Sequence, residues 1–247
     1  MRIATRLSFL SDIPFLGPKI RSGWRMWRYY RTLLGWYWNA FRAPGDAPLR
    51  PARLYRVSTH RITHRVQPEP FKPDDTGRVV GGDWDQHRTH LTNTDSLYEG
   101  LQDRYEHGTP WVETEFYKAQ VDRIEQGESA WGCKTTDELR TRYDRLDDVY
   151  QSMQTDGYRS AQELGGGRTT AALDEICVHI ARDGELLFAG EGNHRIRLAK
   201  LLELDEIAVR IVVRHEQWQT IRDSIANNET TLAELDLDPE HPDLNNL

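Results

Sequence analysis

The residues best suited to chemistry in this chain form one short run, Gly190-Glu191-Gly192-Asn193-His194-Arg195. Glycine permits positive φ angles and lets a ligand approach the backbone closely. A strand is expected before this run and a helix after it, so the free N–H groups at the helix start can hold an anion. His194 and Arg195 add side-chain donors, and an arginine can contact two phosphate oxygens at once. We therefore predict a turn that binds a phosphate or a similar anion, through Gly190, Gly192, Asn193, His194 and Arg195.

Three carboxylates are candidates for a catalytic role. Glu191 lies inside the turn and would suit a general base that activates a hydroxyl group. Asp83 and Asp85 are alternatives for the base, or would help to hold Mg²⁺. Each of the three, taken alone, also fits an ordinary turn residue or a solvated group.

Arg214 and His215 directly follow the last expected strand. Ligand sites of α/β sheets gather at strand ends, so these two residues are predicted to contact substrate or phosphate, or else to cap a following helix. No metal site is predicted. Cys133 and Cys177 lack metal-ligand spacing, and no metal-like pairing on a single helix occurs among His60, His64, His87, His90 and His107.

The segment that must position the turn alternates between strand and helix patterns. Its β-branched runs and its Arg182-Asp183-Gly184-Glu185 hairpin signal are typical of paired strands. The expected elements are a strand at 176–180, a hairpin turn at 182–185, a strand at 186–189, a helix at 194–204 and a strand at 207–213. Shorter strand material is expected at 54–57 and 62–66.

Residues 96–162 are expected to be helical. Apolar residues recur there at three- and four-residue spacing, which predicts one helix around Leu97 to Tyr105, a second over 113–125 and a third over 137–153. Thr136 resembles the N-cap of the third helix. Trp84 and Trp111 are expected to be core aromatics.

On these residues the chain resembles the ParB/sulfiredoxin-like superfamily. Gly192-Asn193-His194-Arg195, followed by a short helix, an acidic turn and the strand at 207–213, is similar to the superfamily's Gly-x-His/Arg-Arg turn for nucleotide phosphates. The resemblance covers 175–215, so the helical block at about 96–162 would be an insertion. It implies an α+β fold with a small mixed sheet and helices, to which this chain is expected to add the insertion and an N-terminal amphipathic helix.

Two departures from the superfamily's pattern argue against two of its branches. Asn193 stands where sulfiredoxin has a cysteine, which argues against thiol chemistry. The 32 residues after His215 are acidic, unlike the DNA-binding region that follows in chromosome-partitioning relatives. The remaining branch resembles free serine kinase, which transfers phosphate from a nucleotide to a small hydroxyl compound.

The resemblance therefore implies nucleotide binding, with ATP, ADP and CTP left open and Mg²⁺ as a further candidate. It also implies a phosphotransferase that acts on a small or lipid-linked hydroxyl compound. The alternatives are a non-catalytic nucleotide-binding or ParB-like DNA-associated module, and a membrane-associated adaptor. Nucleic acid is not the expected partner, because most of the chain is acidic.

Charge is distributed unevenly along the 247 residues. Residues 1–65 hold 13 Lys and Arg against two acids, a balance of +11, whereas the rest holds 19 basic and 37 acidic residues, a balance of −18. This asymmetry suggests an anionic partner for the N-terminal part. With no run of 18 apolar residues, we expect a cytoplasmic protein, with peripheral membrane association left open.

Residues 20–42 are predicted to form an amphipathic helix. One face carries the apolar residues Met26, Trp27, Tyr30, Leu34, Tyr37, Trp38 and Phe41, and a second face carries five arginines. Such a helix suits either an anionic membrane surface or packing on the domain. The expected organisation is a basic aromatic segment at 1–47, the α+β domain at 48–222 and an acidic tail at 223–247, disordered from His241 onward.

Overall fold

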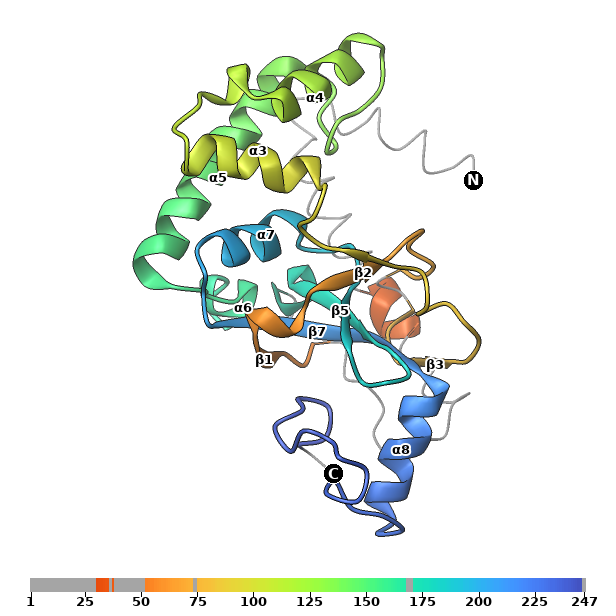
Figure 1. Cartoon of the computed structure of the whole chain (residues 1–247). Helices are drawn as coiled ribbons and strands as arrows, with labels where there is room; N and C mark the ends of the chain where they lie inside the picture. Colours follow the sequence, from red (N-terminus) through yellow and green to blue (C-terminus); the bar gives the residue numbers. More distant parts are fainter. Residues whose placement is uncertain (1–29, 36, 38–51, 73–74, 168–170, 246–247) are drawn as a thin grey trace.

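A computed structural model describes residues 30–35, 37, 52–72, 75–167 and 171–245 of the chain. In this part of the chain the fold is α+β, as predicted, and its centre is a seven-stranded mixed sheet (Figure 1). The strands are β1 (Tyr55–Ser58), β2 (His64–Val66), β3 (Arg78–Val80), β4 (Arg88–His90), β5 (Ile176–Ile180), β6 (Leu186–Phe188) and β7 (Glu206–His215).

Strand β7 organises the sheet. It pairs with β1 in antiparallel orientation and with β5 and β3 in parallel orientation, and the sheet continues from β5 through β6 and β2 to β4. Nine consecutive residues of β7, from Ile207 to His215, are buried. A nearly continuous apolar, β-branched run is what a strand covered on both faces requires.

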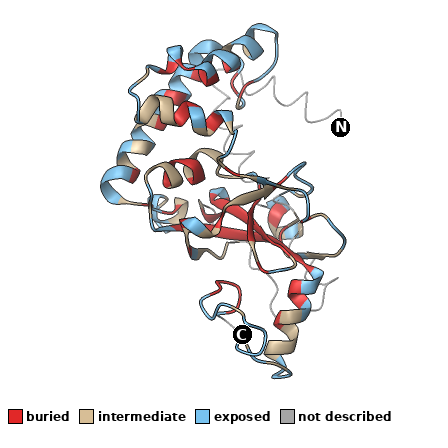
Figure 2. Ribbon diagram, viewed as in Figure 1, coloured by how far each residue is buried: buried red, intermediate tan, exposed pale blue. Residues whose placement is uncertain are grey.

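The two faces of the sheet carry different cores. Ile176, Val178 and Ile180 of β5 join the main core on the face covered by helices, and Cys177 joins a smaller core with Phe71 and Trp84 on the other face. In Figure 2 the central strands of the sheet are coloured as buried. The alternation follows from the two-residue period of a strand. Trp84 is partly buried against this second core, and Trp111 is buried in the main one, so both are core aromatics as predicted.

The helical block predicted at 96–162 is confirmed. It consists of α3 (Ser96–Tyr105), a short 3-10 turn at Trp111–Glu113, α4 (Glu115–Glu125), α5 (Thr136–Asp156) and α6 (Ala161–Leu164). The N-cap of α5 is Thr135 rather than Thr136, because the Thr135 hydroxyl accepts a hydrogen bond from the Glu138 N–H at 3.2 Å. In Figure 1, α3, α4 and α5 form a helical lobe above α7 (Asn193–Leu201).

One carboxylate holds this lobe together. Asp147 on α5 accepts hydrogen bonds from Arg104 (2.6 Å), from the Tyr105 hydroxyl (2.9 Å) and from the Trp111 indole N–H (2.9 Å). Burial raises the pKa of Asp147, but these three donors outweigh it and leave the pKa below its ordinary value. The lobe is therefore fixed by one satisfied polar centre as well as by its apolar core.

A buried ion pair joins the lobe to the helix that follows the glycine turn. Arg197 of α7 is 1% exposed, and its guanidinium donates two hydrogen bonds, of 2.8 and 2.7 Å, to the carboxylate of Asp95. The same carboxylate caps α3 by accepting from the Tyr98 N–H at 2.9 Å. The start of the lobe and α7 are thus held in one arrangement.

The disorder expected from His241 onward is wrong for residues 241–244. α8 (Glu216–Ala226) follows β7, and residues 241–244, expected to be disordered, are buried against the domain. Asp243 is the reason. Its carboxylate accepts from Arg214 and from the Trp218 indole N–H, and it forms an ion pair with Arg222, whose Nε donates to the Asp243 carbonyl. Asp243 thus neutralises two buried guanidinium groups.

The helix predicted at 20–42 is described only in part. Residues 30–35 and 37 are helical, and the other predicted positions, like most of the expected segment 1–47, lie outside the described residues. Among the described residues, no helix has the length and apolar character needed to cross a bilayer.

Candidate functional site

The glycine turn is shaped by a close approach to β5. Gly190 and Gly192 have φ angles of 79° and 84°, in the left-handed region that favours glycine. A Cβ on Gly192 would lie 2.9 Å from the Ile176 Cα and 2.7 Å from its Cγ1, so no side chain fits there. The turn is also tied to β5 through the Cys177 N–H, which donates to the Glu191 carbonyl at 3.2 Å.

The side chain of Asn193 stabilises the turn through two hydrogen bonds. Its side-chain amide N–H donates to the Gly190 carbonyl, and its Oδ1 accepts from Arg197 at 3.1 Å. Both ends of the amide are therefore engaged by the protein. We had expected Asn193 to bind the ligand; its side chain instead holds the shape of the turn, because the buried Arg197 needs an acceptor there.

The N-terminus of α7 has the open donors expected of an anion site. Gly192 occupies the N-cap position, where no side chain caps the helix. The N–H groups of the first turn have no partner within their own helix and carry the positive end of its dipole. The sequence prediction of an anion site rested on this helix start, which the structure places directly after the glycine turn.

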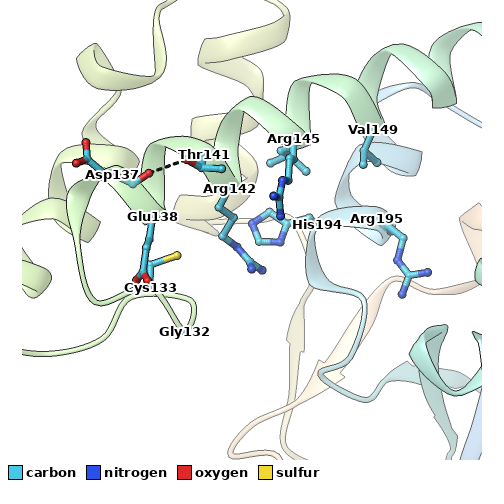
Figure 3. Close-up of a pocket in the computed structure, with 11 residues that line it drawn as sticks. Gly132, Cys133, Asp137, Glu138, Thr141, Arg142, Arg145, Val149, His194 and Arg195 are labelled. Atoms are coloured by element: carbon cyan, nitrogen blue, oxygen red, sulfur yellow. Dashed lines mark hydrogen bonds between the residues drawn. The ribbon is translucent and has the colours of Figure 1, made fainter. Parts of the chain in front are cut away.

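A cleft of about 690 Å³ opens between the start of α7 and one face of α5 (Figure 3). His194 and Arg195 reach it from α7, and the side chains of Thr141, Arg142 and Arg145 reach it from α5. Cys133, Asp137, Glu138, Leu146 and Val149 complete much of the wall. The cleft is thus built from two segments about 50 residues apart, held together by the Arg197–Asp95 pair.

His194 is a neutral group at the back of this cleft. Burial, together with the positive charges of Arg142 and Arg197, lowers its pKa to about 3. Its ring lies edge-on to Trp131, with 4.8 Å between ring centroids. Its Nε2 is buried and has no hydrogen-bond partner among the described residues. A buried polar nitrogen without a partner is costly, which points to a ligand or a water that would satisfy it.

Arg195 is held by the protein. One guanidinium nitrogen donates to Glu175 at 2.9 Å, and another donates to the Asp174 carbonyl. Glu175 is fully buried and also accepts from the Ala161 N–H at 2.7 Å and from the Tyr158 hydroxyl. Arg195 therefore has a structural role. Its remaining donors still border the cleft, and its contact with phosphate stays a prediction.

Arg142 and Arg145 are the positive groups that sequence reasoning missed. They lie one turn apart on the cleft face of α5 and are exposed. Among the described residues neither forms an ion pair with a carboxylate. The sequence signal that could have found them is their spacing. On the predicted helix they lie three residues apart, and Leu146 and Val149 each follow one of them by four residues, on the same face.

The three predicted catalytic carboxylates lie at different places. Glu191 is at the turn, although its side chain does not line the cleft. Asp85 is fully buried at the other end of β5, where Arg182 donates hydrogen bonds of 2.7 to 3.1 Å to it. Burial raises the pKa of Asp85, but the hydrogen bonds from Arg182 lower it to about 2. Asp83 is exposed and contacts the same arginine at 2.8 Å.

Asp83 and Asp85 are therefore corrected from catalytic to structural positions. Cys177 touches the glycine turn and Arg182 lies five residues farther along, a span of roughly 15 Å in an extended strand. Neither carboxylate can serve a ligand at the start of α7. Among the described residues, no group of three or more His, Cys, Asp or Glu side chains is arranged to hold a metal ion.

Arg214 and His215 are also structural. Arg214 is 4% exposed and is bound by Asp243, with 2.8 Å between its Nε and the carboxylate. The His215 ring caps α8 by accepting from the Gln217 N–H at 3.1 Å, while its other nitrogen lies 2.8 Å from the Gly82 carbonyl. The alternative of a helix cap is thus confirmed for His215, and the predicted ligand contact of Arg214 is wrong because Asp243 covers it.

Comparisons with known proteins add no relative: no protein-family model matches the chain, and neither a curated protein nor a solved structure shows significant similarity to it.

Proposed function

We propose that the cleft between α5 and α7 binds a phosphorylated small molecule, and that this molecule is a nucleotide. The observation that carries the proposal is the convergence of Arg142 and Arg145 with the uncapped start of α7 and the buried Nε2 of His194. Two guanidinium groups that form no ion pair with a carboxylate in the described part of the chain, next to an uncapped helix start, suit an anion with several oxygens.

The size and lining of the cleft support a ligand larger than a single phosphate. Ligand sites typically span about 300 to 1,000 Å³ and combine apolar walls with a few polar groups. Here Leu146 and Val149 supply apolar surface on α5, beside the arginines. The resemblance of the turn to the ParB/sulfiredoxin-like superfamily, whose members bind nucleotide phosphates with this turn, favours a nucleotide over other phosphate esters.

A phosphotransferase reaction is the further part of this proposal. It would need a base beside the acceptor hydroxyl, and Glu191 is the one predicted carboxylate that lies at the turn. Loss of a general base typically lowers a rate by about 10²- to 10⁴-fold with little effect on binding. Glu191→Gln should therefore lower the turnover of a nucleotide with hydroxyl acceptors by about 10²- to 10⁴-fold and leave nucleotide affinity unchanged. Turnover that survives this substitution would remove Glu191 from the mechanism.

The test of binding is calorimetry with ATP, ADP, CTP and inorganic phosphate. Arg142→Ser and Arg145→Ser should each weaken nucleotide binding by about tenfold, the effect of one charge-assisted contact. Arg123→Ser on α4 is the matched control, because it removes an exposed arginine that pairs with Glu128 at 3.0 Å outside the cleft. Equal affinities in all three variants would refute the proposed site, as would the absence of binding to any of these ligands.

Arg195→Ala tests the same site less specifically, because this substitution should affect both binding and stability. The position of Arg195 in the glycine turn predicts that this substitution weakens binding without changing the fold. Removing Arg195 would instead leave the buried carboxylate of Glu175 without its positive partner, and breaking a buried pair is strongly destabilising. A loss of binding in that variant would mix the two effects, which is why the α5 arginines are the better targets.

A further inference from the structure

The cleft between α5 and α7 has two chemically different ends. The arginine end, formed by Arg142, Arg145 and the start of α7, carries the positive groups described above. The opposite end, lined by Gly132, Cys133 and Glu138, is acidic (Figure 3). A phosphate group is attracted to the arginine end and repelled from the acidic one, so an elongated phosphate ester can lie in the cleft in one direction only.

Helix geometry sets the distance between the two ends. Glu138, Arg142 and Arg145 follow one another at spacings of four and three residues, so they lie on one face of α5. Glu138 and Arg145 are seven residues apart, which is about 10 Å along the helix axis. That separation is similar to the distance between the base edge and the β-phosphate of an extended nucleotide. A nucleotide whose phosphates lie at the arginine end therefore brings its base to Glu138.

A tight backbone turn borders the acidic end. Ala130 and Cys133 exchange backbone hydrogen bonds of 3.0 and 2.9 Å, which close a two-residue turn between them. Gly132, inside this turn, has a φ of 81°, and a Cβ added to it would meet no atom within 4 Å outside its immediate neighbours. The turn therefore leaves open space beside Gly132. Burial raises the pKa of the Cys133 thiol above its ordinary value, so this side chain stays protonated and adds no charge.

The Glu138 carboxylate keeps acceptor positions for a ligand. Its Oε2 accepts from the Lys134 N–H at 2.8 Å, which holds the side chain near the start of α5. A carboxylate offers about four lone-pair positions, so this bond leaves both oxygens able to accept a further hydrogen bond. Asp137, the other acid of the cleft, instead forms an ion pair with Arg140, which does not line the cleft. Glu138 is thus the carboxylate better placed to accept hydrogen bonds from a base.

We propose that the ligand of the cleft is a guanine nucleotide and that Glu138 recognises its base, an inference that rests on the nucleotide binding proposed above. Guanine carries two neighbouring donors, N1–H and the N2 amino group, which match the two oxygens of a carboxylate. Adenine and cytosine offer one amino donor beside a ring nitrogen that is an acceptor, and uracil presents an N–H between two carbonyl oxygens. Each of these bases brings an acceptor against the carboxylate, which loses a hydrogen bond and adds repulsion.

Calorimetry of the full chain with GDP, ADP, CDP and inosine diphosphate tests this proposal. GDP should bind about tenfold or more tightly than the other three, because a bidentate contact to a base discriminates by about that factor. Inosine diphosphate is the most specific comparison, since its base differs from guanine only by the missing N2 amino group. ADP should still bind through the same phosphate contacts, more weakly than GDP.

Glu138→Gln should change which base is preferred. A glutamine accepts from N1–H with its oxygen and donates from its amide, so it matches xanthine, which carries a carbonyl oxygen where guanine has the N2 amino group. The variant should bind GDP about tenfold more weakly than the wild type does, and xanthosine diphosphate about tenfold more tightly. Asp148→Asn is the matched control, because it removes an exposed carboxylate of the same helix outside the cleft and should leave both affinities unchanged.

The possible results separate this inference from the nucleotide site itself. If none of the nucleotides binds, both the site and the guanine preference are refuted. Equal affinities for GDP, inosine diphosphate and ADP would keep the nucleotide site and overturn guanine recognition. A preference for GDP that Glu138→Gln leaves unchanged would remove Glu138 as the residue that recognises the base. A gain in affinity for xanthosine diphosphate cannot result from lost stability, so it distinguishes recognition by Glu138 from its structural bond to the Lys134 N–H.

Discussion

Replacing Gly192 with alanine tests how tightly the turn is built. Two separate effects should destabilise this variant. An alanine at a φ of 84° costs about 1–2 kcal/mol, because the left-handed region crowds its Cβ. The Cβ would also lie 2.9 Å from the Cα of Ile176, a backbone atom of a fully buried strand that cannot move aside easily. Overpacking of this kind costs about 1–3 kcal/mol.

Gly190→Ala separates these two effects. Gly190 has a similar φ of 79°, but the nearest atom to its added Cβ is the Glu69 Cγ at 3.9 Å, an ordinary contact. Gly190→Ala should therefore lose only the conformational part, about 1–2 kcal/mol, and Gly192→Ala should lose about 2–5 kcal/mol in total.

Urea unfolding, followed by circular dichroism, measures both variants against the wild type. The midpoint should fall in the order wild type, Gly190→Ala, Gly192→Ala, with an unchanged slope that shows the same surface exposed on unfolding. Equal midpoints for the two variants would refute the close approach of the turn to Ile176. Gly192→Ala should also weaken nucleotide binding more than Gly190→Ala, since the open N–H groups follow directly after this residue.

Three further predictions concern buried charge. The pKa of His194 lies near 3 in the folded chain and near its ordinary value of 6.5 in the unfolded chain, so the unfolded state takes up the proton first. The free energy of unfolding should therefore fall as the pH decreases from about 6.5 towards 3, and this group contributes up to about 1.4 kcal/mol per pH unit. In urea titrations at a series of pH values, His194→Gln should remove this contribution. Asp147→Ala should cost about 2 kcal/mol or more, seen as a lower urea midpoint, because three donors lose their common acceptor. Asp243→Ala should cost about 3–5 kcal/mol by the same measurement, because Arg214 and Arg222 stay buried without a counter-ion; an unchanged midpoint would mean that water replaces the carboxylate.

The elements around the turn could be predicted because their signals are local. Glycines at the turn, β-branched runs on both sides and apolar residues at helical spacing each determine structure within a few neighbours. Strands β3 and β4 were missed for the opposite reason. Arg78-Val79-Val80 and Arg88-Thr89-His90 are only three residues long, and the second has no apolar residue. They are strands only because β7 and β2 offer them a partner.

The residues of the candidate site likewise divide into those with a local sequence signal and those that only the tertiary fold brings together. His194 and Arg195 were predicted because they follow the glycine turn in sequence, whereas Arg142 belongs to a helix that only the tertiary fold brings alongside. The structural role of Asp243 could not be predicted from the composition of the segment around it. An acidic, proline-containing ending is typical of disorder, and nothing local indicates that this one carboxylate is the counter-ion of Arg214.

A crystal structure of the chain with ADP tests the central claim most directly. We expect the β-phosphate between the start of α7 and the face of α5, with its oxygens about 2.7–3.2 Å from the first backbone N–H groups of α7 and from the guanidinium groups of Arg142 and Arg145. His194 Nε2 should gain a partner from the ligand or from a water that the ligand holds. A nucleotide bound elsewhere, with Arg142 and Arg145 paired to carboxylates of the protein, would contradict the account.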